Sequence, residues 1–434
     1  MPTVPARPDP PAPPAGAARF ARRGRSTTTF KGSLAQPIHR WFTITPAYAP
    51  ELVADCADHL GAGPAERYLD PFSGSGTTAV WCRTTARPCT AVEWNPALHF
   101  VSRVKAGWRS APDALLAAGT AFVDAWAREA PAPGEARAYL AARAAWVPGI
   151  SHPERWWAPD ALASLTAARV TLAAHPPSDD ARPGIALALM GILIEVSRAR
   201  YSHASITFSA GERVLPATAA RDAFARRLAL IAEDLRALAG RPDLPATVLR
   251  GNALALGAVV PEPGTYTRLI CSPPYPNRYS YARETRPHLF FLDLVADARA
   301  VGELDHAAMG GTWGRATSAL AREHHPSAPA VAAVMAPLLP ALRAAHPLMA
   351  NYAVRYFNDF WQHIAALDGV MAPRARLAYV VGNSKLGGVE VPVTDWLLAL
   401  FAAAGWRPVG PGLHHMRRRN SRPGLVESVL FLER

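Results

Sequence analysis

One glycine-containing turn constrains the fold of this chain more than any other feature. The segment Leu69-Asp-Pro-Phe-Ser-Gly-Ser-Gly-Thr-Thr78 follows a short predicted strand that begins at Arg67, and it runs into a helix that contains Ala79-Val-Trp-Cys82. A second predicted strand, Cys89-Thr-Ala-Val-Glu93, comes next and ends in an acidic residue. Strand, glycine turn, helix and strand make a βαβ unit, which needs a parallel sheet covered by helices. The sequence therefore predicts an α/β fold.

The chemistry of this turn points to a ligand with an anionic end. Glycines let the backbone approach a ligand closely, and the helix that follows directs its N–H groups at a negative charge. The segment lacks the Gly-Lys-Ser/Thr ending of a P-loop and the glycine spacing of a dinucleotide fingerprint. Glu93, about 20 residues after the glycines, stands where an acid accepts hydrogen bonds from ribose hydroxyls. A purely structural turn and a capping Glu93 are the alternatives.

A second motif, Leu269-Ile-Cys-Ser-Pro-Pro-Tyr275, runs from a predicted strand into Ser-Pro-Pro-Tyr. Two successive prolines fix the backbone and remove two N–H donors, which leaves carbonyl groups available as acceptors. Ser272 adds an acceptor and Tyr275 a flat ring, so the site suits a planar amine that is stacked on an aromatic face. As an isolated string, the motif is also compatible with a simple turn.

Between and around these motifs, the pattern changes several times. Residues 1–30 are rich in Pro and Ala and predict a disordered basic tail, either a solvated leader or a phosphate-seeking arm. We expect a cofactor-binding part at 31–108, a mainly helical insertion at 109–245 and a catalytic part at 246–434. Further strands are predicted at 247–250, 268–271, 375–381 and 427–432, and an irregular region, rich in aromatic residues, Arg and His, at about 276–350.

Composition adds information on partners and compartment. Lys and Arg exceed Asp and Glu by 46 to 34, a net charge of +12, which favours a nucleic acid or an anionic membrane surface. Only three of these cations are lysines, so a GC-rich genome is a competing explanation. The four cysteines form no CxxC pair, and no apolar run is long enough to span a bilayer. We therefore expect a cytoplasmic protein that does not enter a membrane.

Together the two motifs resemble those of the S-adenosylmethionine-dependent DNA amino-methyltransferases, in which Ser-Pro-Pro-Tyr is more usual for cytosine. The stretch His39-Arg-Trp-Phe-Thr-Ile-Thr-Pro-Ala-Tyr is similar to the segment that closes over the methionine moiety in that family. Arg250-Gly-Asn252 resembles a third cofactor contact, with Asn252 in place of the usual Asp. The resemblance covers about 39–105 and 247–434, and it implies a Rossmann-like methyltransferase fold with a seven-stranded mixed sheet.

The resemblance also implies roles for individual residues. It assigns S-adenosylmethionine to Thr43, Thr45, Asp70, Pro71, Phe72, Ser73, Gly74, Ser75, Gly76, Thr77, Thr78, Glu93, Trp94, Asn252 and Ser272. It assigns the target base to Ser272, Pro273, Pro274 and Tyr275. The amine hydrogens would bond to Ser272 and the Pro273 carbonyl, which aims the nitrogen lone pair at the methyl group, so that positioning and desolvation supply most of the rate.

The function implied is methylation of the N4 amine of a cytosine that is flipped out of double-stranded DNA, in a restriction–modification or defence system with a cognate nuclease as a further partner. Methylation of adenine N6 or of an RNA base is the alternative among enzymes. An inactive nucleic-acid-binding protein on the same fold is the alternative from another class. The insertion, the 276–350 region, or both would read the DNA sequence. The oligomeric state stays open.

The candidates for contacts with nucleic acid are cations beside aromatic residues (Arg278, Arg283 and Arg315) and a dense run of cations (Arg417, Arg418 and Arg419). Core packing of Tyr279, Tyr281 and Trp313, and a solvated hairpin at 416–422, are the alternative interpretations. Covalent catalysis by Cys89 or Cys271 is disfavoured, because both belong to predicted buried strands. The histidines lack metal-ligand spacing, so no metal site is predicted.

Overall fold

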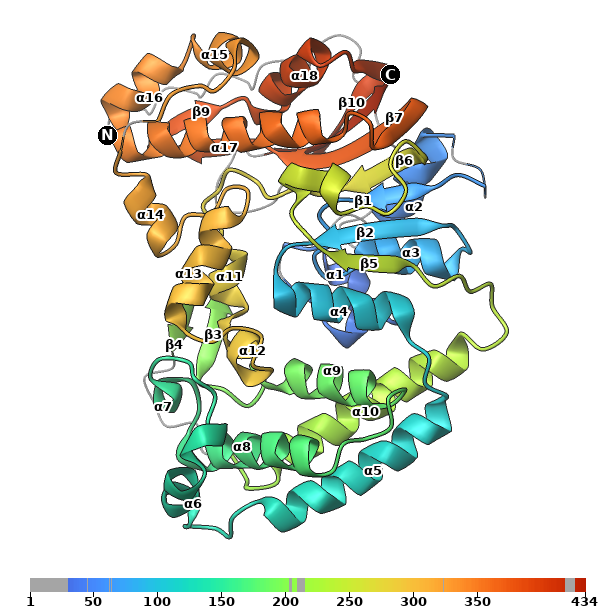
Figure 1. The fold of residues 1–434 in the computed structure, drawn as a ribbon, viewed down its shortest axis with the longest axis vertical. Helices are drawn as coiled ribbons and strands as arrows, with labels where there is room; N and C mark the ends of the chain where they lie inside the picture. Colours follow the sequence, from blue (N-terminus) through green and yellow to red (C-terminus); the bar gives the residue numbers. More distant parts are fainter. Residues whose placement is uncertain are drawn as a thin grey trace, which may run out of the picture.

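The computed structural model describes residues 30–44, 46–61, 63, 65–202, 205–208, 215–322, 324–417 and 426–434. The predicted tail lies outside these ranges, apart from Phe30, which begins the short helix α1 (Phe30–Ser33). The centre of the molecule is a seven-stranded sheet in the order β10-β11-β7-β6-β1-β2-β5 (Figure 1). Its strands are β1 (Tyr68–Asp70), β2 (Cys89–Glu93), β5 (Thr247–Arg250), β6 (Tyr266–Cys271), β7 (Met371–Gly382), β10 (Arg407–Arg417) and β11 (Val426–Glu433).

The strand order creates a switch point beside β1. The chain moves from β1 outward to β2 and β5, then returns to the other side of β1 to form β6. All neighbouring pairs from β5 to β7 are parallel, whereas β11 is antiparallel to both β7 and β10. In open α/β sheets, ligands bind in the crevice outside the carboxyl ends of the strands at such a point. The ends of β1 and β6 are therefore where a site is expected.

Side chains alternate between two apolar cores, as a sheet that is covered on both faces requires. Tyr68 and Ile270 face one core, whereas their neighbours Leu69 and Leu269 face the other. The first core holds α2 (Pro50–His59), α3 (Thr77–Thr84) and α4 (Pro96–Gly107). The second holds η4 (Ala253–Ala258), α17 (Pro347–Ala366) and α18 (Val393–Ala403).

The insertion between β2 and β5 is mainly helical and continues the first core. Its aromatic centre joins Trp126, Phe122 and Phe224, whose ring centroids lie 5.4–5.9 Å apart. Figure 1 shows most of its helices gathered below α4, with one hairpin, β3 (Ala199–Ser202) and β4 (Ser205–Phe208), to the left. The helices are α5 (Pro112–Glu129), α6 (Ala136–Ala142), η3 (Ala144–Trp146), α7 (Pro153–Trp156), α8 (Pro159–Ala174), α9 (Arg182–Ile192) and α10 (Ala219–Ala237).

The 276–350 region differs from the expectation, because it is largely helical rather than irregular. Prolines such as Pro287, Pro329 and Pro347 stand in the first turn of a helix, where a missing N–H costs nothing, so they begin helices instead of breaking them. The helices are α11 (Tyr281–Glu284), α12 (Arg286–Phe291), α13 (Ala298–Ala307), α14 (Arg315–Ala319), α15 (Pro329–Met335) and α16 (Leu339–Ala345). A small hairpin, β8 (Ser384–Leu386) and β9 (Val389–Val391), follows β7.

The mixed seven-stranded sheet, its helical covers and the mainly helical insertion confirm the predicted Rossmann-like α/β fold of the methyltransferase type. The strands predicted at 89–93, 247–250, 268–271, 375–381 and 427–432 all exist, and β6, β7 and β11 are longer than predicted. Within the described ranges, none of the helices combines the length and the apolarity that crossing a membrane would require.

Candidate active site

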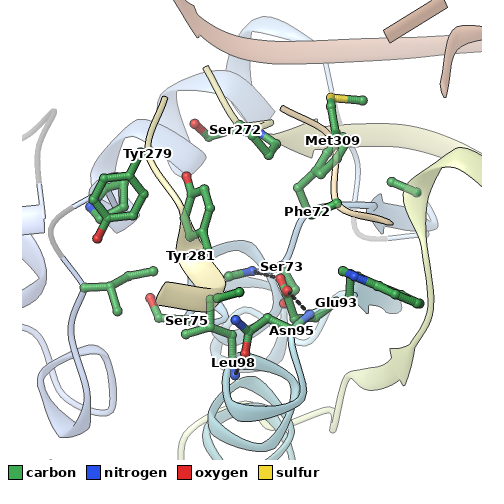
Figure 2. A pocket seen from close by; sticks show the side chains of 18 of the residues that line it. Phe72, Ser73, Ser75, Glu93, Asn95, Leu98, Ser272, Tyr279, Tyr281 and Met309 are labelled. Atoms are coloured by element: carbon green, nitrogen blue, oxygen red, sulfur yellow. Dashed lines mark hydrogen bonds between the residues drawn. The ribbon is translucent and has the colours of Figure 1, made fainter. Parts of the chain in front are cut away.

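A cleft opens at the carboxyl ends of β1, β2 and β6, where the strand order switches. It encloses about 910 Å³ of space, including open solvent at its mouth. Figure 2 shows Tyr279 and Tyr281 on one side, Phe72 and Met309 on the other, Ser272 at one end and Glu93 and Asn95 at the other. The structure thus brings the two sequence motifs to one cavity.

The glycine segment forms the wall nearest α3. Gly76 precedes this helix at φ 87°, and a Cβ added to it would lie 2.9 Å from Ser102 Oγ and 3.2 Å from Ser102 Cα. Both the left-handed backbone and the close approach therefore require glycine. The predicted residues of this segment that line the cleft are Pro71, Phe72, Ser73, Gly74, Ser75 and Thr77.

Glu93 ends β2 at the wall of the cleft. Its Oε2 accepts a hydrogen bond from Gly74 N, and its Oε1 accepts one from Asn95 N, both at 2.7 Å. A carboxylate has about four acceptor positions, so acceptor capacity remains for a ligand hydroxyl. Burial raises the pKa of Glu93 to about 7, although the backbone hydrogen bonds oppose the shift. Its protonation is therefore poised near neutral pH.

Three predicted cofactor residues, Asp70, Gly76 and Thr78, lie behind the cleft wall rather than on it. Asp70 is fully buried; its Oδ1 accepts a hydrogen bond from Phe72 N at 3.0 Å, and its Oδ2 has no partner in the described chain. Burial raises the pKa of Asp70 to about 8. Thr78 Oγ1 bonds to Ile270 O at 3.2 Å and to Tyr48 Oη. The side chains of Asp70 and Thr78 therefore hold the glycine turn in place through hydrogen bonds on the side away from the cleft.

The Ser-Pro-Pro-Tyr segment leaves β6 at the opposite end. Ser272 and Pro274 line the cleft, whereas Pro273 and Tyr275 do not. Ser272 Oγ lies 3.3 Å from Tyr275 Oη, so the serine and the ring belong to one hydrogen-bonded unit. The Pro274 carbonyl accepts the Tyr356 hydroxyl at 2.9 Å. The Pro273 carbonyl accepts no hydrogen bond from the residues that the structure describes.

Another wall comes from α13 and the turn that follows it, which the sequence patterns did not reveal. Leu304, Asp305, Ala308, Met309 and Gly311 line the cleft. Asp305 is buried and its Oδ2 accepts the backbone N–H groups of Thr312 and Trp313 at 2.8 and 2.7 Å, while Oδ1 bonds to Ser280. No local motif announces this carboxylate, because its partners come from two separate turns.

Trp94 and Asn252 attach this wall to the sheet. Trp94 Nε1 donates to Leu304 O at 2.8 Å, and Asn252 Nδ2 donates to Ala307 O at 2.9 Å. Both residues line the cleft as well. Asn95 was also missed, although Asn95-Pro96 is a recognisable helix start: its Oδ1 accepts the N–H groups of Ala97 and Leu98.

The N-terminal segment that precedes α2 forms the remaining wall through Ile44, Pro46, Ala47 and Tyr48. Thr43, a predicted cofactor residue, does not line the cleft, and Thr45 lies outside the described residues. None of the four lining residues was predicted, although all of them belong to the stretch that carries the resemblance.

The predicted nucleic-acid contacts fall into three groups. Arg278 is exposed and Arg283 half-buried, and both flank Tyr279 and Tyr281 at the cleft. Arg315 is not an unpaired cation, because its guanidinium pairs with the carboxylate of Glu303 on α13. The side chain of Arg417, at the end of β10, and all of Arg418 and Arg419 lie outside the description.

Neither a metal centre nor a reactive thiol emerges from the part of the chain that is described. It contains no group of three or more His, Cys, Asp or Glu side chains that could hold a metal ion. All four cysteines are buried, and burial raises the pKa of the Cys271 thiol far above its usual value. A thiol held in its protonated form is a poor nucleophile.

Comparison with known proteins gives limited sequence similarity. No family model matches the chain. The type II methyltransferase M.BsoBI of Geobacillus stearothermophilus is 26% identical over 81 residues, which are 19% of this chain and only 16% of that protein. The crystal structure of TrmN from Thermus thermophilus aligns with 93% of this chain and with 52% of the TrmN chain, at 11% sequence identity and a TM-score of 0.29. The sequence match therefore covers less than a fifth of either protein.

Proposed function

We propose that this protein transfers a methyl group from S-adenosylmethionine to the N4 amine of a cytosine that is flipped out of double-stranded DNA. One observation carries the proposal: the glycine segment, Glu93 and Ser272 line a single cleft at the switch point of the sheet. A methyl donor and an amine acceptor must meet within reacting distance, and one cavity between the two motifs meets that requirement.

The residues at the cofactor end fit the proposed donor. Glu93 has acceptor capacity for ribose hydroxyls, and Gly74 lines the cleft where an added Cβ would meet only Phe72 O, at 3.9 Å. Trp94, Asn252 and Leu304 give a wall with both apolar and polar atoms beside Glu93. When bound, S-adenosylmethionine would supply an electrophilic methyl group on sulfonium sulfur.

The residues at the other end fit an amine that donates two hydrogen bonds. Ser272 Oγ lines the cleft, and the carbonyl of the next residue, Pro273, accepts no hydrogen bond from the described residues, whereas the Pro274 carbonyl already accepts the Tyr356 hydroxyl. If both amine hydrogens are held in this way, the nitrogen lone pair is no longer delocalised into the base ring, and the amine becomes nucleophilic. The Tyr275 ring then offers a stacking face for the base. The proton released after transfer goes to solvent.

The name of the matched relative, a type II methyltransferase, supports a role in a restriction–modification or defence system. Exposed Arg278 and the neighbouring tyrosines at the cleft are consistent with a nucleic-acid substrate, since cations beside aromatic rings contact phosphates and unstacked bases.

Two measurements test the proposal. Calorimetry should detect binding of S-adenosylmethionine, and DNA from a host that expresses the chain should contain N4-methylcytosine by mass analysis of its nucleosides. A Tyr275→Ala variant is the control: the tyrosine does not line the cleft, so the variant should bind the cofactor without modifying DNA. N6-methyladenine without methylcytosine would overturn the base assignment. A chain that binds DNA but no cofactor would overturn the catalytic role.

A further inference from the structure

A buried carboxylate of the insertion controls the path of the N-terminal segment. Asp234, on α10, is 1% exposed, and its Oδ2 accepts hydrogen bonds from Ile38 N and Trp41 Nε1, both at 2.9 Å. Arg40 supplies two further donors to Oδ1: Nε at 3.0 Å and Nη2 at 2.5 Å. A charged acceptor makes such bonds shorter and stronger than those between neutral groups.

These bonds fix a turn that the local sequence does not favour. Ile38 has φ 65°, a left-handed conformation that a β-branched residue rarely adopts. Such a conformation persists only where the surroundings determine it. The Ile38 N–H points at Asp234, so the carboxylate is part of those surroundings.

A second buried polar side chain holds the other side of the same segment. Lys105, on α4, is 1% exposed, and its ammonium donates to His39 O at 3.2 Å and to Phe42 O at 3.1 Å. The segment is therefore fixed between α10 and α4 up to Phe42. Beyond that point it becomes a wall of the cleft, through Ile44 and residues 46–48.

The wall reaches the glycine segment directly. Tyr48 Oη bonds to Thr78 Oγ1, and Thr77 Oγ1 lies 3.5 Å from Tyr48 O. A shift of the segment at residues 38–41 would move Ile44 and Ala47 relative to Ser73 and Ser75, across the cleft. The wall thus depends on a residue about 190 positions away in sequence, within an insertion that contributes no lining residue of its own.

We propose that Asp234 is a positioning residue for cofactor binding: it sets the wall formed by residues 44–48 against the glycine segment. This role rests on the proposed function for the identity of the ligand, S-adenosylmethionine. It also gives the insertion a role at the cofactor end of the cleft, in addition to any contact with DNA.

The test compares two Asp→Asn variants of the full chain that each weaken one contact of α10. Asp234→Asn loses the charge and one acceptor at the N-terminal segment. Asp113→Asn, the matched control, weakens the exposed Asp113–Arg236 pair between α5 and α10, 2.5 Å long and away from that segment. Asp234→Asn should weaken binding of S-adenosylmethionine roughly tenfold, with kcat at saturating cofactor changed much less. The control should bind as the wild type does.

Hydrogen exchange of the ligand-free protein provides a second readout. Amides of 38–48 should exchange faster in Asp234→Asn than in Asp113→Asn, while those of β1 and β2 stay protected. If Asp234→Asn fails to fold, Trp41→Phe removes a single donor to the same carboxylate and should give a smaller change in the same direction. Wild-type affinity and protection in a folded variant would overturn the proposal. If the wild type binds no S-adenosylmethionine, the proposed function fails, and exchange still decides the role of Asp234.

Discussion

The ring of Tyr275 lies against the backbone of Gly382 at the end of β7. A Cβ added to Gly382 would lie 3.1 Å from both Cδ2 and Cε2 of the tyrosine, closer than an ordinary van der Waals contact. Since Tyr275 Oη also lies 3.3 Å from Ser272 Oγ, the glycine and the serine confine the ring from two sides. The orientation of the proposed stacking face therefore depends on the absence of a Cβ at Gly382, in β7.

A Gly382→Ala substitution should displace the Tyr275 ring. Overpacking of a filled site costs about 1–3 kcal/mol if nothing moves, so the ring is expected to shift. A displacement of this size at the reacting end should lower kcat by roughly tenfold to a hundredfold, with cofactor affinity unchanged. Steady-state kinetics and calorimetry would separate the two effects.

The control for this substitution is Gly107→Ala, where an added Cβ meets nothing within 4 Å. It should leave kcat at the wild-type value. Unchanged turnover in Gly382→Ala would show that the ring position is unimportant, and a parallel loss of cofactor binding would show that the effect is not confined to the amine end.

Cofactor binding should depend on pH through Glu93. Burial raises the pKa of this carboxyl to about 7 in the free protein, so it is largely protonated below that pH. Ribose hydroxyls donate more strongly to the carboxylate than to the acid, so the ligand favours the ionised form. Affinity should therefore increase as pH rises toward 7 and level off above it. Glu93→Gln should bind more weakly and lose this pH dependence, measured by calorimetry from pH 5.5 to 8.5; an identical slope in both proteins would contradict the assignment.

Local sequence patterns were enough to predict the strands and to identify the glycine segment and Ser-Pro-Pro-Tyr as site segments. Alternation along a strand and a glycine turn are each encoded within a few residues. Asp305 and Asp234 were not predictable in this way. Asp305 accepts a hydrogen bond from Ser280, 25 positions away, and Asp234 accepts one from Ile38, 196 positions away, so each role exists only after the chain has folded. The 276–350 region was predicted to be irregular and rich in aromatic residues, Arg and His, whereas it is largely helical and several of its prolines begin helices.

DNA binding should respond to Arg278 with a measurable change in salt dependence. The backbone of this residue is fixed by Tyr352 Oη, which lies 3.3 Å from Arg278 N, while its side chain is exposed beside Tyr279. If the guanidinium contacts one phosphate, Arg278→Ala should reduce the slope of log affinity against log salt by about 1. Arg374→Ala, at an exposed site near the start of β7 and so at the edge of the sheet opposite the cleft, should leave the slope unchanged. If the slope of log affinity against log salt is the same in the wild type, in Arg278→Ala and in the control variant, Arg278 does not contact a phosphate.

Stability below neutral pH should depend on His363. This buried residue bridges Ala253 O, 2.9 Å from Nδ1, and Tyr379 Oη, 2.7 Å from Nε2, and its ring packs on Phe72 in the glycine segment. Burial lowers the pKa of His363 from 6.5 to about 4, so between these values the unfolded state binds a proton that the folded state does not. The free energy of unfolding should therefore decrease as pH falls from 6.5 to 4, by up to about 3 kcal/mol from this residue.

A His363→Gln variant isolates this contribution. It should be less stable than the wild type at pH 8, because it loses buried hydrogen bonds, yet its stability should fall less steeply between pH 6.5 and 4. Part of the acid dependence should remain, since burial also lowers the pKa of His288 to about 4. Urea unfolding at a series of pH values measures both slopes. Parallel curves for the two proteins would mean that His363 takes up a proton in the folded state as readily as in the unfolded chain.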